Sequence, residues 1–318
     1  MGTREHPETY DVVVAGGGAA GLNAALVLGR ARRRVAVVDA GAPRNAPATH
    51  MHGFLSRDGM PPADLLAVGR DEVAGYGGEL LQGRVDQIDP GFLVHLATGP
   101  ALPARRVLVA TGLRDELPEL PGVGERWGKD LLHCPYCHGY EVRGQPLGVL
   151  GTGPASVGQA LLVRQWSDDV VFFPHTLDVT GDERERLTAR GVPIVDGMVR
   201  RLVMEGDRLP GVELAEGQVV ARAAVFVFPR MVAHDTLLTG LGCDKDEDGW
   251  VITDPSGRTS VPGVWAAGNV ASPRAQVLTA AAMGSAAAIA INHDLVDEEV
   301  AHAVEHDRTA PGPSRISR

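Results

Sequence analysis

Apolar runs of strand length alternate along the chain with glycine-rich turns and helical stretches, and one such pattern occurs twice. Its first occurrence comprises a strand, a glycine turn, a helix and a second strand, at 11–15, 16–21, 22–30 and 34–39. The second occurrence has the same order, at 146–150, 151–153, 155–166 and 170–173. A strand that leads through a tight turn into a helix and then into another strand is a βαβ unit. The pattern therefore predicts an α/β fold with two Rossmann-like, three-layer (ββα) domains.

Further elements are predicted between and after these units. Helices are expected at 63–75 and 275–293, and strands at 79–89, 92–97, 106–110, 192–202, 212–214, 223–229 and 263–267. Prolines and glycines at 117–124 predict a linker. A second boundary is expected near 241–248, and the polar, proline-containing segment from 303 is expected to be flexible.

Composition agrees with two lobes and narrows the classes of partner. The 318 residues exceed what one simple core usually holds. The formal net charge of −10 argues against a nucleic-acid surface, which needs a basic stripe. The one arginine cluster, at 30–34, is interpreted as a solvated helix end.

No cleavable leader pattern is recognised at the start of the sequence, which predicts a cytoplasmic protein. The longest weakly polar stretch, 277–291, is shorter than the roughly 20 residues that a membrane span requires. It is interpreted as a buried helix, and no membrane association is expected.

The glycine turn of the first βαβ unit fits the G-x-G-x-x-G pattern of a dinucleotide site. It follows a strand, opens a helix and has an acidic residue some 20 positions later, as that pattern requires. Its glycines let the backbone approach a pyrophosphate at the helix N-terminus, and the acidic residue can accept from ribose hydroxyls. The residues concerned are Gly16, Gly18, Ala19, Ala20, Gly21 and Asp39. The alternative is a glycine-rich turn without a ligand.

Two of the three cysteines form a C-x-x-C motif in the string CPYC at 134–137. No second pair completes a four-ligand zinc site, and we predict no metal, although His133 and His138 flank the motif. Inert buried thiols are the other alternative. A thiolate stabilised by its neighbour can attack a disulfide, so a redox dithiol is the favoured interpretation. His138 is placed to move a proton to or from a thiol near neutral pH.

The end of the chain gives these motifs a common context. The segment GVWAAGNV at 263–270, followed by RAQ at 274–276 and an alanine-rich helix, resembles the C-terminal flavin-binding segment of low-molecular-weight thioredoxin reductases. The resemblance covers nearly the whole chain. It includes the N-terminal glycine turn, ATG at 110–112 and the C-x-x-C just before the second βαβ unit.

The resemblance implies an FAD-binding domain interrupted by an inserted NAD(P)-binding-like domain that carries the C-x-x-C. The implied boundaries are 1–115 and 244–302 for FAD binding, 116–243 for the insertion and 303–318 for a flexible tail. A homodimer is also expected. Besides the first glycine turn and Asp39, the implied FAD contacts are Ala110, Thr111, Gly112, Gly268, Asn269, Gln276 and Val277. Asn269 replaces the usual Asp, and its amide can still hydrogen-bond the ribityl chain.

The inserted domain departs from the reductases where these bind NADPH. Ser156 occupies the third glycine position of its turn, with Pro154 inside the turn. The following strand runs into Pro174-His175-Thr176, where the reductases have arginines, and no Arg occurs between Arg164 and Arg184. Without a bidentate guanidinium, recognition of the 2′-phosphate loses its usual source. NADPH use is therefore in doubt, while NADH and a vestigial lobe stay open.

The string CPYCHGYE and the loop HGFL at 52–55 resemble FAD-dependent dithiol oxidases of gliotoxin and holomycin biosynthesis. That resemblance implies oxidation of a small dithiol to a cyclic disulfide, with O2 as acceptor and H2O2 as product. Cys137 would be the flavin-proximal sulfur, Cys134 the one that joins the substrate, and His138 the acid/base. The alternatives are a disulfide reductase using NAD(P)H or ferredoxin, and a redox sensor without turnover. Cys243 is interpreted as a small hydrophobe, and His50 and His52 as possible substrate or flavin contacts.

Overall fold

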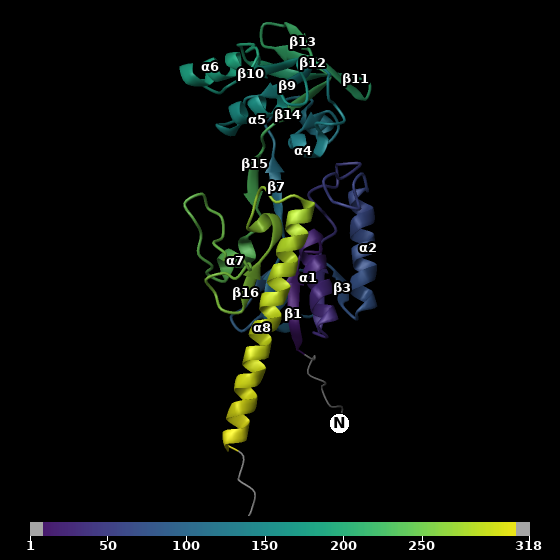
Figure 1. Cartoon of the computed structure of the whole chain (residues 1–318), viewed down its shortest axis with the longest axis vertical. Helices are drawn as coiled ribbons and strands as arrows, with labels where there is room; N and C mark the ends of the chain where they lie inside the picture. The colour runs from purple at the N-terminus through teal and green to yellow at the C-terminus, as the bar shows by residue number, and fades with distance from the viewer. Residues whose placement is uncertain (1–8, 310–318) are drawn as a thin grey trace, which may run out of the picture. The chain divides into compact units, whose positions relative to one another are not determined.

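The computed structural model describes residues 9–309, which form two compact units (Figure 1). The first unit takes in the chain up to Pro43, Asp64–Leu113 and the chain from Ala233 onward. The second consists of Arg44–Ala63 and Arg114–Val232. The two chain crossings, β7 (Leu113–Glu116) and β15 (Arg230–Ala233), pair with each other as a two-stranded ribbon.

A mostly parallel sheet forms the centre of the first unit. Its strands are β1 (Tyr10–Ala15), β2 (Val35–Asp39), β3 (Glu79–Gln82), β6 (Leu102–Val109) and β16 (Val264–Ala266), extended by the hairpin β4 (Val85–Ile88) and β5 (Leu93–Leu96). The order is β3-β2-β1-β6-β5-β4, and β16 pairs parallel with β6. Strands β1 and β2 are buried almost throughout, which explains why their sequences are nearly continuous apolar runs and do not alternate between apolar and polar residues.

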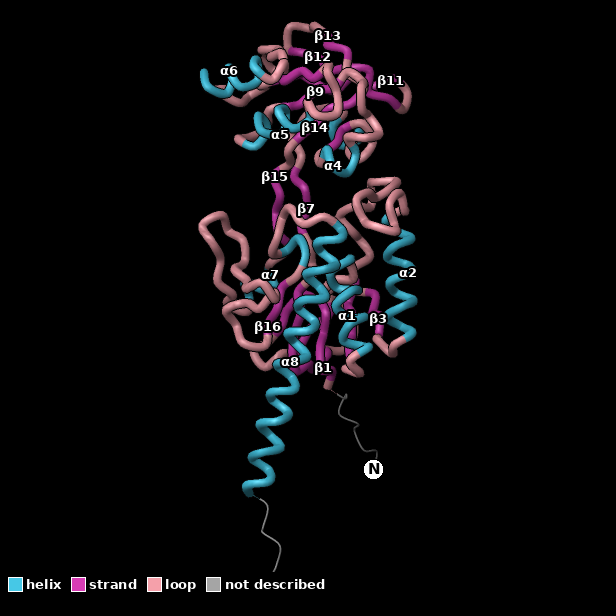
Figure 2. Tube along the Cα trace, in the orientation of Figure 1, coloured by secondary structure: helices cyan, strands magenta, loops and turns pink. Residues whose placement is uncertain are grey.

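Helices α1 (Ala19–Arg30) and α8 (Val277–Thr309) pack side by side against one face of this sheet (Figures 1 and 2). Their closest approach needs Gly284, because a Cβ there would lie 2.0 Å from the carbonyl oxygen of Ala20. The helix α2 (Pro62–Gly75) contributes Leu66 and Val73 to the same core. On the other face a second core includes the short helix α7 (Thr236–Gly240) and Cys243, so the unit is layered.

The second unit contains a four-stranded parallel sheet of order β10-β9-β14-β8. These strands are β8 (Leu131–Leu132), β9 (Leu147–Leu150), β10 (Val170–Phe173) and β14 (Ala224–Val227). Helices α5 (Ala155–Val163) and α6 (Gly181–Ala189) share the apolar core on one face. The antiparallel sheet of β11 (Val199–Glu205), β12 (Arg208–Leu214) and β13 (Val219–Ala221) packs on the other, with α3 (Val123–Arg126). The predicted α/β fold with two Rossmann-like domains is confirmed.

The unit boundaries differ from the expected domains at two places. The return to the first unit comes at Ala233 rather than after residue 243, because Leu237, Leu238 and Cys243 are part of its core. The segment Arg44–Ala63, expected within the FAD-binding domain, groups with the second unit. There Arg44 pairs with Asp115 at 2.7 Å.

The flexible tail expected from residue 303 is wrong for its first part. The helix α8 continues to Thr309, sixteen residues beyond the expected helix end at 293. Alanine, glutamate and arginine are good helix formers, and the two prolines of this segment, at 311 and 313, come after Thr309 in the sequence. Residues 310–318 of that expectation lie outside the described residues.

Candidate active site

The two cysteines of the C-x-x-C lie at the carboxyl end of a strand of the second unit's parallel sheet. Strand β8 ends at Leu132, and Cys134 is the N-cap of the single-turn helix α4 (Pro135–His138). Proline at the first position of that turn is pre-organised for helical geometry. The turn brings the Sγ atoms of Cys134 and Cys137 to 2.6 Å, with both residues partly exposed. The geometry suits a pair that opens and closes a disulfide.

The two histidines beside the cysteines lie in different environments. The ring of His133 meets Phe228 edge-on at 4.9 Å between centroids. Burial lowers the pKa of His133 to about 4, with a smaller opposing influence from Asp115. Its imidazole is therefore neutral near pH 7 and a poor proton carrier there.

His138 keeps the predicted position at the end of the single-turn helix. Burial lowers the pKa of His138, while the charge of Glu141 opposes this and that of His52 adds to it. A neutral, partly exposed imidazole is the form that accepts a proton from a thiol. His138 thus has the state that a general base needs.

The loop at 50–60 contributes two further ionisable side chains, His52 and Asp58, and His52 also contacts Glu141. His52 Nε2 lies 3.5 Å from Glu141 Oε1, and its Nδ1 lies 3.3 Å from Asp58 Oδ2. Asp58 also accepts from the backbone N–H of Gly53 at 2.8 Å. Sequence reasoning kept His52 as an open possibility but missed Glu141. Its position three residues after His138 was the available signal.

No group of three or more His, Cys, Asp or Glu side chains that could hold a metal ion occurs in residues 9–309. Cys243 is buried against the first unit's core, and burial raises the pKa of its thiol. Of the three cysteines, Cys134 and Cys137 are partly exposed and Cys243 is buried, so the C-x-x-C is the candidate site of thiol chemistry.

The first glycine turn is shaped by close backbone approach. Gly16 has φ +110°, and a Cβ there would lie 2.4 Å from the carbonyl oxygen of Ala110. A Cβ on Gly21 would lie 1.9 Å from the carbonyl oxygen of Gly16. At Gly18, the N-cap of α1, an added Cβ would meet nothing within 4 Å. Two glycines are therefore fixed by packing, while the third faces open space in front of the helix that begins with Ala19 and Ala20.

Asp39 lies beside this turn at the end of β2. An added Cβ on Gly17 would come within 2.7 Å of the Asp39 Cβ. The carboxylate accepts from Arg70 Nη2 at 3.1 Å and from the Gly41 N–H at 3.2 Å. It is held next to the open space by these two donors.

The other predicted FAD contacts gather at the same carboxyl edge of the first sheet. Ala110 follows β6, and Gly268 follows β16, whose strands both run parallel to β1. The Thr111 hydroxyl donates to the His234 carbonyl at 2.6 Å, and Gly112 has φ +71° with open space around it. These segments form an edge with the geometry of a dinucleotide site.

Asn269, a predicted FAD contact, also makes side-chain hydrogen bonds within the chain. Its Nδ2 donates to the carbonyl oxygens of Ser272 and Ala275, both at 2.9 Å, and so fixes the loop that leads to α8. Gln276 and Val277 lie at the start of that helix, where the Gln276 carbonyl accepts from Ala280. The loop therefore places these residues at the same edge as Gly268.

The glycine turn of the second unit is built differently. Ser156 is fully buried, and its Oγ accepts from the backbone N–H of Thr152 at 3.0 Å and of Gly153 at 3.3 Å. The Thr152 hydroxyl donates to the Phe228 carbonyl at 2.8 Å. Beyond β10, His175 adopts φ +56°, and its Nδ1 accepts from the Val199 N–H at 3.0 Å. The amides that a nucleotide phosphate would use thus have a partner within the chain.

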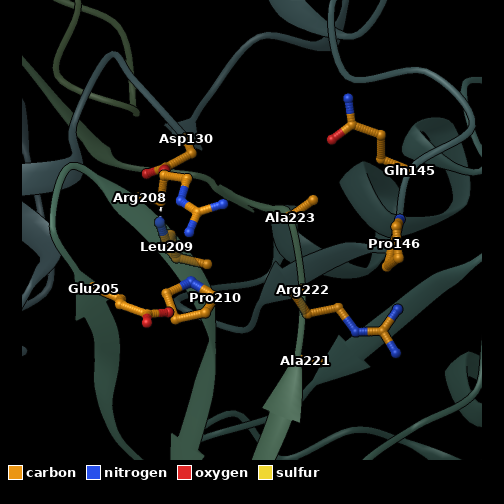
Figure 3. A pocket seen from close by; sticks show the side chains of 10 residues that line it. All are labelled: Asp130, Gln145, Pro146, Glu205, Arg208, Leu209, Pro210, Ala221, Arg222 and Ala223. Carbon is orange, nitrogen blue, oxygen red and sulfur yellow. Dashed lines mark hydrogen bonds between the residues drawn. The ribbon is translucent and has the colours of Figure 1, made fainter.

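A hollow of about 490 Å³ lies at the opposite edge of this second sheet (Figure 3). It is lined by residues that precede strands of the parallel sheet, among them Asp130, Gln145 and Ala223, and by residues of β11, β12 and β13. Asp130 is engaged there with Arg126 and with the Leu209 N–H. Cys134 and Gly151 follow their strands instead, so this hollow is not part of the cysteine site.

The family model for pyridine nucleotide-disulphide oxidoreductases matches residues 10–285. The chain belongs to this family. It is 30% identical to the thioredoxin reductase sirT of Leptosphaeria maculans, over 93% of this chain and 97% of the relative. A crystal structure of HlmI superposes with a TM-score of 0.94 at 65% identity, over 96% and 98% of the two chains. A putative thioredoxin reductase from Bacillus anthracis gives 0.86 at 34% identity, over 91% and 99%.

These matches confirm three predictions: a thioredoxin reductase-like chain, an oxidoreductase, and sulfur groups as its substrates. Proteins of this kind are flavoproteins. Among the helices in residues 9–309, none combines the length and the apolar character needed to cross a membrane.

Proposed function

We propose that this protein binds FAD and oxidises a small dithiol to an intramolecular disulfide, passing the electrons to O2 with formation of H2O2. The observation that carries the proposal is the contrast between a C-x-x-C with a neutral His138 and a second glycine turn occupied by Ser156. The first feature supports thiol chemistry, and the second argues against nicotinamide as the electron source.

The nicotinamide argument rests on two separate defects. The Ser156 hydroxyl takes the N–H groups of Thr152 and Gly153, which would otherwise face a pyrophosphate. No arginine follows β10 before Arg184, and Arg184 pairs with Asp196 at 2.8 Å. NADPH therefore loses both its phosphate cradle and its usual guanidinium partner.

FAD fits the first unit on the evidence of its own backbone. The open space at Gly18 and Gly112, beside turns that Gly16 and Gly21 make possible, suits a pyrophosphate at the start of α1. Asp39 offers carboxylate oxygens for ribose hydroxyls, and the segment at 268–277 would face the flavin part. Bound there, FAD would supply a two-electron acceptor for the cysteine pair and a site at which O2 can be reduced.

The short distance between the two sulfurs permits a disulfide, and the resemblance to the dithiol oxidases implies the separate roles of Cys134 and Cys137. A substrate thiolate attacks the Cys134 sulfur of the closed disulfide, the bond to Cys137 breaks, and Cys137 leaves as a thiolate. The second substrate sulfur then attacks the first, which forms the product disulfide and releases the Cys134 thiolate. Two electrons thereby pass from substrate to the cysteine pair. His138 accepts the proton of each attacking substrate thiol in turn and passes it to the cysteine thiolate that leaves in the same step, so that two protons accompany the two electrons.

Anaerobic titration of the purified holoprotein tests the proposal. Flavin absorbance is followed after addition of dithiothreitol, NADPH or NADH, and air is then admitted. We expect bleaching by the dithiol, no bleaching by either nicotinamide, and stoichiometric peroxide on aeration. Rapid bleaching by NADPH would overturn the proposal in favour of a reductase.

A thioredoxin reductase-type activity is the second candidate, because several relatives carry that name. A reductase would draw electrons from NAD(P)H or from ferredoxin. The titration covers the nicotinamides, and reduced ferredoxin is added as a further arm. Flavin bleaching by ferredoxin together with failure of the dithiol would favour this candidate.

A homodimer is proposed alongside this function. The helix α8 presents Ile289, Val296 and Val300, each about half exposed, at spacings of seven and four residues. Such spacing places apolar side chains on one helix face. Light scattering of the holoprotein should give twice the chain mass of 33.5 kDa.

A further inference from the structure

A chain of alternating carboxylates and an imidazole runs toward the cysteine pair within the second unit. Asp58 lies 3.3 Å from one nitrogen of His52, and Glu141 lies 3.5 Å from the other. Asp58 is itself fixed by the Gly53 N–H. Its outer end is open to solvent, because 67% of the Asp58 side chain is exposed, while the His52 side chain is 25% exposed.

The inner end of this chain is Glu141, three residues after His138 in the sequence. The backbone continues helically through Gly139, so Glu141 follows His138 by about one turn. Both Glu141 and His52 act electrostatically on His138, Glu141 raising and His52 lowering its pKa. His133 is a further titratable group that interacts electrostatically with His138, and Cys134 and Cys137 belong to the same single-turn helix and its N-cap.

We propose that Glu141 and His52 are positioning residues that control proton transfer at His138. The inference rests on the proposed acid/base role of His138 and adds two residues to it. The carboxylate of Glu141 acts electrostatically on His138, and His52, 3.5 Å from that carboxylate, fixes its position. The loop at 50–60, distant in sequence from the cysteines, thereby takes part in their chemistry.

The two residues have opposite signs, which makes the test sharp. Glu141→Gln removes the negative charge that raises the pKa of His138, so this pKa should fall. His52→Gln removes the side chain whose electrostatic influence lowers the pKa of His138, so this pKa should rise. A purely structural role would not move the two variants in opposite directions. Glu141→Asp keeps the charge and should restore most of the native value.

Histidine NMR of the oxidised holoprotein measures this titration directly. The His138 resonance is assigned by its loss in His138→Gln. Glu185→Gln, which removes one exposed carboxylate from α6, is the matched control and should leave the titration unchanged. An unchanged His138 titration in both Glu141→Gln and His52→Gln would overturn the proposal.

The pH profile of anaerobic flavin reduction by dithiothreitol supplies the functional readout. Its acidic limb should move in the same directions as the NMR titrations. A limb that stays fixed while His138 shifts would also overturn the proposal, because His138 would then not govern the rate. Reduction of the native protein by NADPH would instead contradict the proposed function, and the NMR result would stand apart from it.

Discussion

The two units share a strand, a glycine turn and a helix, but their turns are filled differently. In the first unit, Gly18 faces open space and no side chain caps α1 within the described chain. In the second, the buried Ser156 hydroxyl closes the turn from inside. The same topology therefore has a first turn without a side-chain cap and a second turn whose backbone N–H groups donate to a hydroxyl. The repetition of a fold within one chain therefore does not imply that both copies bind the same kind of ligand.

The largest effect is expected from Gly21→Ala in the first turn. A Cβ at 1.9 Å from the Gly16 carbonyl oxygen cannot be accommodated, and a backbone atom cannot move aside cheaply. We expect loss of bound flavin and a decrease of about 3 kcal/mol or more in the free energy of unfolding. Flavin content after gel filtration and urea unfolding measure the two quantities.

Gly18→Ala is the matched control for that variant. Its Cβ would meet nothing within 4 Å, and the backbone φ of −76° suits any residue. The unfolding free energy of the apoprotein should change by no more than about 0.5 kcal/mol, while FAD binding weakens. Equal losses of unfolding free energy in both variants would contradict the presence of open space at Gly18.

The second unit should also respond more strongly to acid. The pKa of His133 is lowered to about 4 by burial, whereas an unfolded histidine has a pKa near 6.5. Between these values the unfolded state binds more protons, so stability rises with pH and is lost as pH falls from 6.5 toward 4. The loss should reach about 3 kcal/mol at most.

Unfolding monitored by tryptophan fluorescence at several pH values tests this expectation, in a variant with Trp250 and Trp265 replaced by Phe so that the signal comes from Trp127 and Trp166 of the second unit. The slope between pH 6.5 and 4 should flatten in His133→Gln. A slope that persists in this variant would assign the acid sensitivity to other groups.

How far local sequence predicts structure depends on how far apart the interacting residues are. Strand β10 was predicted at its observed bounds, and β1 to within one residue, because each is an apolar run with flanking turn residues. The C-x-x-C and its histidine were predicted because they form a motif of adjacent residues. The contact of His52 with Glu141 joins segments with no shared pattern, and no local spacing could reveal it. The ring of His133 likewise packs against Phe228, which follows β14 and is distant in the sequence.

A smaller loss of stability than that of Gly21→Ala is expected from Ser156→Ala in the second turn, and this variant tests the comparison most directly. The variant loses the acceptor for the Thr152 and Gly153 N–H groups, which should cost about 1 to 2 kcal/mol of unfolding free energy. Dithiol-driven flavin reduction should keep its rate, because the cysteines and His138 are untouched. Flavin bleaching by NADPH should remain absent even in Ser156→Gly, since freeing the amides supplies no guanidinium for the 2′-phosphate. If Ser156→Gly alone allowed NADPH to bleach the flavin, the difference between the two units would reduce to one hydroxyl group.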